Sequence, residues 1–85
     1  MLLEKIKNIP IGYSEVNYKD KTYGVTRNDF NNGKSIKIYA EELGGSDFIS
    51  LNYYITNNNE LLKPCEMSEQ KVIHFLNNYM LSHEN

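Results

Sequence analysis

The sequence predicts an α+β fold with two layers, in which a four-stranded antiparallel meander carries a short N-terminal helix and a C-terminal helix (α-β-β-β-β-α). Three observations predict this class. Apolar residues recur with helical spacing near both ends of the chain, they alternate with polar residues at period two in residues 35–56, and the connections between extended segments are short. Short connections favour antiparallel neighbours, because a parallel pair needs a crossover of a dozen or more residues.

The two helices are predicted near the chain ends. Residues 2–9 place apolar side chains at i, i+4 and i+7, and Pro10 ends the segment because the residue before a proline avoids the helical region. Ser68 is positioned to cap a second helix that runs to about Leu81. The apolar side chains of that helix share one arc of the helical wheel: Val72, Ile73, Phe75, Leu76, Tyr79 and Met80. One face of each helix is therefore expected to be buried.

Four segments between the helices are predicted as strands: residues 13–18, 22–27, 35–41 and 48–56. Residues 19–21 are short enough for a hairpin, and the Asn-Asn-Gly run that ends at Gly33 indicates a tight turn. A double glycine at residues 44–45 gives the next reversal. Residues 61–63 are expected to add a short edge piece before Pro64.

The size and charge of the chain limit the classes of function. Its 85 residues leave room for one small domain, residues 1–85. The net charge of −2 and the single arginine, Arg27, disfavour a nucleic-acid partner, because phosphate contacts usually recruit lysine or arginine. One cysteine cannot form an intramolecular disulfide, and no apolar run approaches the ~20 residues of a membrane span. We expect a cytoplasmic protein without a membrane partner.

Cys65 is the one soft nucleophile in the sequence. It precedes the helix expected after Ser68, and the positive end of a helix dipole favours the thiolate that attacks substrates. Glu66 and Glu69 oppose this effect, because nearby negative charge disfavours a thiolate. Two interpretations stay open: Cys65 is a small packing residue, or it is a thiol catalyst.

The histidines and acidic residues do not match a known ligand spacing. His74 is expected to point to solvent, opposite the apolar arc of its helix, and with His83 near the terminus no zinc motif is present. Glu41, Glu42 and Asp47 flank the double-glycine turn, but the spacing of a calcium loop is missing. The sequence therefore predicts no metal site and no cofactor.

Aromatic residues are the most suggestive feature for function. Tyr39, Phe48 and Tyr54 are expected on the sheet face that the C-terminal helix leaves uncovered. Interfaces are enriched in aromatic residues, so these three are candidate partner-binding residues. In the alternative interpretation they only pair across strands beneath the first helix. Stacking of single-stranded bases on this face ranks third, because the chain is acidic.

Three stretches of the chain resemble a family of short, uncharacterised bacterial proteins, some of which carry the label peptide methionine sulfoxide reductase. They are residues 23–27, residues 39–52 and residues 63–67, which read Tyr-Gly-Val-Thr-Arg, Tyr-Ala-Glu-Glu-Leu-Gly-Gly-Ser-Asp-Phe-Ile-Ser-Leu-Asn and Lys-Pro-Cys-Glu-Met. The Gly-Cys-Phe-Trp and Arg-Tyr-Cys motifs of true reductases are absent. The resemblance therefore assigns no catalytic residue here.

Two functional hypotheses follow. In the first, the protein is a small cytoplasmic binding or assembly module rather than an enzyme, which docks a protein partner or a second copy through the uncovered aromatic face or an edge strand. In the second, it is a thiol-dependent reductase, similar to peptide methionine sulfoxide reductases, in which Cys65 attacks an oxidised sulfur.

Overall fold

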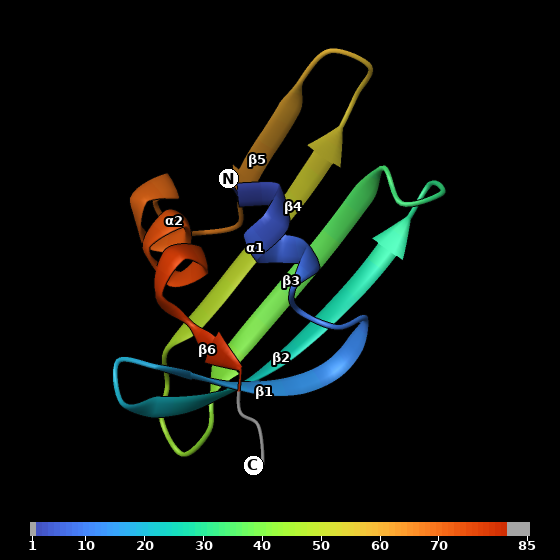
Figure 1. The fold of residues 1–85 in the computed structure, drawn as a ribbon. Coiled ribbons are helices and arrows are strands. Elements are labelled where there is room, and N and C mark those ends of the chain that lie inside the picture. Colours follow the sequence, from blue (N-terminus) through green and yellow to red (C-terminus); the bar gives the residue numbers. More distant parts are fainter. Residues whose placement is uncertain (1, 82–85) are drawn as a thin grey trace.

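The part of the chain that the structure describes, residues 2–81, forms one sheet of six antiparallel strands with two helices against it. The structure is a computed structural model (Figure 1). In chain order the elements are α1 (Leu2–Lys7), β1 (Gly12–Tyr18), β2 (Lys21–Phe30), β3 (Ser35–Glu42), β4 (Phe48–Ile55), β5 (Glu60–Pro64), α2 (Glu69–Asn78) and β6 (Met80–Leu81). The order across the sheet is β5-β4-β3-β2-β1-β6, so β1 to β5 form a meander and β6 joins the edge of β1.

The α+β class with an antiparallel sheet is confirmed, but the predicted number of strands is wrong. The sequence pattern predicts a four-stranded meander with a short edge piece at residues 61–63. The edge piece is present as β5, whereas β6 was not predicted, and the sheet of residues 2–81 has six strands. The predicted helix to Leu81 is also too long. It ends at Asn78, because Tyr79 has an extended backbone (φ −70°, ψ 154°) and its N–H bonds to the carbonyl of Phe75. Met80, expected in the buried arc, is 67% exposed.

The predicted turns lie where the backbone takes positive φ angles. Lys19 and Asp20 both do so (54° and 62°), which makes the first hairpin a two-residue turn and starts β2 at Lys21. Residues 31–33 have φ angles of 57°, 58° and 86°, which Asn and Gly tolerate better than other residues do. These turns fix the pairing of β1 with β2 and of β2 with β3.

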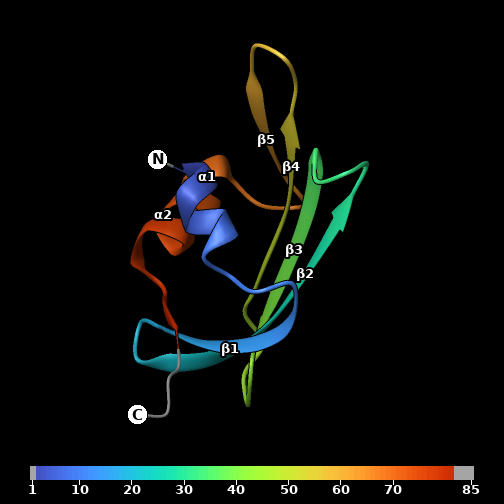
Figure 2. The same ribbon diagram turned by 45° about the vertical axis from the view of Figure 1, so that its right-hand side comes forward.

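Both helices cover the same face of the sheet, which we call the helix face (Figure 2). In Figure 2 the strand β1 curves beneath the helices, while the other side of β2, β3 and β4 carries no element. The core lies between the helices and the sheet: Ile6, Ile9, Val16, Tyr18, Tyr23, Val25, Ile36, Ile38, Ala40, Ile49, Leu51, Tyr53, Val72, Phe75 and Leu76 are buried. The alternation predicted for residues 35–41 and 48–56 therefore places the correct side chains in the core.

Arg27 ties the N-terminal segment to the sheet. Its guanidinium donates to the carbonyl oxygens of Lys7 and Ile9, at 3.3 and 2.7 Å, and makes two hydrogen bonds to the carboxylate of Asp29, at 2.9 and 2.8 Å. These bonds hold α1 on the helix face. The interpretation in which the first helix covers the uncovered aromatic residues is therefore wrong.

Candidate protein-interaction face

The face without helices, which we call the open face, is ordered in four rows across the strands. Residues paired in a β-ladder point to the same side, so the register of β1 to β5 defines each row. The acidic row contains Glu15, Gly24, Glu41 and Phe48, and the tyrosine row contains Tyr13, Thr26, Tyr39 and Ser50. The basic row contains Asn28, Lys37, Asn52 and Lys63, and the apolar row contains Phe30, Ser35, Tyr54 and Leu61.

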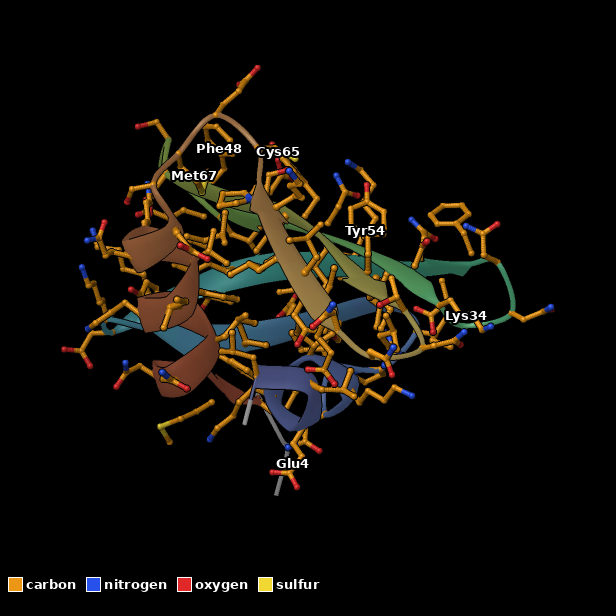
Figure 3. All side chains as sticks on the ribbon, turned by 90° about the horizontal axis from the view of Figure 1, so that it is seen from above. Glu4, Lys34, Phe48, Tyr54, Cys65 and Met67 are labelled. Carbon is orange, nitrogen blue, oxygen red and sulfur yellow. The ribbon has the colours of Figure 1, made fainter. Side chains whose placement is uncertain are left out.

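The three predicted partner-binding residues lie on this face, in two groups. The rings of Tyr39 and Phe48 stack, with their centroids 6.0 Å apart and their planes at 30°. Tyr54 lies further along β4, in the apolar row, and the basic row separates it from Tyr39. Figure 3 shows Phe48, Tyr54 and Cys65 on the side of the sheet opposite Glu4 of α1.

Three exposed apolar or aromatic residues of the open face were not among the predicted partner-binding residues. Tyr13, Phe30 and Leu61 are 63%, 52% and 48% exposed, which exceeds the 40% of Tyr39 and the 36% of Tyr54. Phe30 was outside the predicted strand, because β2 continues three residues beyond residue 27. Continuing the period-two alternation to residue 30 is the signal that identifies it.

The hydroxyl groups of the two central tyrosines have no partner within residues 2–81. Neither Tyr39 nor Tyr54 makes a side-chain hydrogen bond there. By contrast, the hydroxyls of Tyr18, Tyr23, Tyr53 and Tyr79, on the helix side, are each hydrogen-bonded. The two open-face tyrosines therefore combine an exposed ring with a free donor, which is the combination that favours tyrosine in interfaces.

Tyr13 and Gly24 form a close contact at the edge of the open face. A Cβ atom on Gly24 would come within 2.5 Å of the Tyr13 hydroxyl oxygen, so the ring lies directly over the glycine. The Tyr13 ring shields the backbone of Gly24 from solvent, which a glycine inside a strand otherwise leaves exposed. This contact explains a glycine in the middle of β2 without any ligand.

Cys65 follows β5 and lies beside the tyrosine row. Its N–H donates to the carbonyl of Ser50 at 2.9 Å, and its Sγ accepts from Nδ2 of Asn52 at 3.4 Å. Within residues 2–81, no hydrogen bond joins the thiol to a histidine, lysine or arginine. His74 bonds instead to Tyr18, on the helix side. The interpretation of Cys65 as a thiol catalyst stays a prediction.

A polar cluster on the helix side joins α2 to the sheet. Asp47 accepts from the hydroxyl of Tyr23 and from Nζ of Lys71, each at 2.7 Å, and the Tyr18 hydroxyl lies 2.5 Å from Nδ1 of His74. The hydrogen bonds from Lys71 and Tyr23 lower the pKa of Asp47, while burial and Asp47 raise the pKa of Tyr23 well above its ordinary value. Tyr18, Asp47, Lys71 and His74 line an open groove of about 560 Å³.

The acidic residues of the double-glycine turn do not converge. Glu41 lies in the acidic row of the open face, Glu42 pairs with Lys21 at 3.4 Å, and Asp47 pairs with Lys71. Within residues 2–81, no three His, Cys, Asp or Glu side chains are placed to hold a metal ion. His83 lies outside the described residues.

Comparisons with known proteins find no match: no family model, no curated protein and no solved structure matches the chain. The resemblance to short bacterial proteins therefore stays a prediction. Neither helix of residues 2–81 has the length and apolar character needed to cross a lipid bilayer.

Proposed function

We propose that this protein is a binding or assembly module whose contact surface is the open face. The observation that carries the proposal is the group of exposed aromatic and apolar side chains on a face that no element covers within residues 2–81. Single exposed apolar residues are ordinary on a protein surface, but two groups of them on one uncovered face favour an interaction site. A cytoplasmic location, expected from the sequence, is part of the proposal.

The edges of the sheet are less suited to binding than its face. β5 is a short edge strand that begins with Glu60, contains Lys63 and ends at Pro64, and charges and proline on an edge disfavour pairing with another strand. At the opposite side, Met80 and Leu81 of β6 occupy part of the edge of β1. Of the two surfaces expected from the sequence, we therefore propose the face and not the edge.

The chemistry of the face fits a protein partner. Aromatic rings supply a large contact area at low conformational cost, and the free hydroxyls of Tyr39 and Tyr54 can pair with polar groups of a partner. Lys37 and Lys63 are the lysines of the basic row, and the acidic row faces the same side, so the face has no uniform positive field for a nucleic acid. The proposal requires neither a metal nor a cofactor.

Sedimentation of the purified protein, alone and in lysate of the producing cells, tests this proposal. We expect the wild type to associate with itself or with a protein from the lysate, and the Tyr39→Ala/Tyr54→Ala double variant to lose that association. Asn77→Ala is the control, because Asn77 is exposed on α2, which covers the helix face. Circular dichroism establishes that the variants fold. Equal sedimentation of all three proteins in both media contradicts the proposal.

A further inference from the structure

Charges on the open face follow a fixed order along β3. Lys37, Tyr39 and Glu41 occupy alternate positions of this strand and all three are exposed. β3 is the third of the five meander strands, so these side chains lie at the centre of the face. Neither Lys37 nor Glu41 takes part in an ion pair within residues 2–81. Both charges are thus available to a partner.

The cross-strand neighbours of the two charges are neutral. Lys37 lies between Asn28 and Asn52, and Glu41 lies between Gly24 and Phe48. No oppositely charged residue directly beside them explains their placement. A partner with the reverse order of charges, negative opposite Lys37 and positive opposite Glu41, would satisfy both.

A second copy of this chain has that reverse order when its strands run in the opposite direction. A two-fold axis parallel to the rows and placed over the tyrosine row maps the acidic row of one copy onto the basic row of the other. Tyr39 then faces Tyr39 of the second copy, and Lys37 of each copy faces Glu41 of the other. With the strands running in the same direction, lysine would face lysine and glutamate would face glutamate.

We propose that the partner of the open face is a second copy of this chain, packed face to face with its strands reversed about Tyr39. This inference rests on the proposed function. Two sheets that pack in this way keep their strand directions within about 30° and lie ~10 Å apart, a distance that the tyrosine rings and the long Lys37 and Glu41 side chains can span. The interface is isologous, so each charge pair occurs twice.

The size of the face predicts a weak dimer. With the axis over the tyrosine row, the acidic, tyrosine and basic rows of the two copies overlap, and each row has four residues. Strands spaced ~4.8 Å apart and rows spaced ~7 Å apart then give about 400 Å² of flat area per copy. A stable complex usually buries ~800 Å² per partner, so a dissociation constant in the micromolar range or above is expected. Added salt should weaken the dimer further, because the charge pairs lie near solvent.

Charge exchange on β3 tests the inference. In Lys37→Glu, the new glutamate of each copy faces Glu41 of the other copy. In Glu41→Lys, the new lysine of each copy faces Lys37 of the other copy. Each variant alone should therefore raise the dissociation constant at least about tenfold in sedimentation equilibrium. An equimolar mixture of the two variants restores opposite charges at every contact and should associate about as tightly as the wild type. The Lys37→Glu/Glu41→Lys double variant should dimerise with itself for the same reason.

Two results overturn the inference. Equal dissociation constants for the wild type and both single variants show that these charges do not face each other. A wild type that stays monomeric at every concentration rules out the second copy as partner. In that case the proposed function still stands if the wild type captures a protein from lysate that the Tyr39→Ala/Tyr54→Ala variant does not, so the two failures are distinguishable.

Discussion

The two faces of the sheet use the same residue types for different purposes. On the helix side, tyrosine rings pack into the core and their hydroxyls bond to Asp47, Glu60, His74 or the carbonyl of Lys5. On the open face, Tyr39 and Tyr54 stand exposed and their hydroxyls have no partner within residues 2–81. The difference shows that tyrosine content alone does not indicate a binding surface. What distinguishes the open face is the exposed aromatic area of Tyr39 and Tyr54, whose hydroxyls are unpaired within residues 2–81.

The helix face should lose the most stability when its buried charge pair is broken. The side chains of Arg27 and Asp29 are 8% and 19% exposed, so Arg27→Met leaves a carboxylate and two carbonyl groups without their donor. We expect a cost of about 3–5 kcal/mol in urea unfolding. Lys37→Met, on the open face of the neighbouring strand, should change the free energy of unfolding by less than about 0.5 kcal/mol. Similar losses of unfolding free energy in both variants would contradict the expected difference in stability between the two faces.

Adjacent residues of β4 provide the next comparison. Leu51 is fully buried on the helix face, and Leu51→Ala should cost about 2–5 kcal/mol. Asn52, one residue further, is half-buried on the open face, and Asn52→Ala should cost less than about 1 kcal/mol for its single hydrogen bond to Cys65. Chemical denaturation of both variants measures the two costs. The reverse order would show that the register of β4 is shifted by one residue.

The ion pair between Asp47 and Lys71 should have a smaller and pH-dependent effect. Because Lys71 and Tyr23 hold the pKa of Asp47 below its ordinary value of 3.8, the folded state binds a proton less readily than the unfolded state does. The stabilisation of the folded state by this ion pair is therefore complete above pH 3.8, and it is lost as the pH falls through the pKa of Asp47 in the folded state. About a third of each side chain is exposed, so Asp47→Asn should cost only about 1 kcal/mol or less at pH 7. A cost that does not shrink in acid would contradict this pairing.

How far the sequence predicted this structure depends on the length of each pattern. The alternation of β3 and β4 spans eight residues in each strand, and a shift by one position would expose every core side chain, so the pattern identifies the open face and Tyr39. β6 has only two residues, and its pairing with β1 depends on where α2 ends. No local pattern could indicate it.

The composition of the candidate site was only partly predictable for the same reason. Tyr39, Phe48 and Tyr54 belong to long alternating segments, whereas Phe30 and Leu61 lie beside turns, where the alternation is short. The order of the four rows depends on the register between strands. That register is set by turns such as Lys19-Asp20, whose backbone angles the sequence suggests but does not specify. The contact between Tyr13 and Gly24 joins two strands and has no signature in either one.

A concentration series of two-dimensional NMR spectra of the wild type tests the central claim most directly. If the open face is where two copies meet, backbone amide signals of Thr26, Tyr39 and Ser50 should shift as the concentration rises, while those of α1 and α2 stay fixed. Spectra that do not change with concentration, or that change only on the helix side, would contradict the face-to-face dimer.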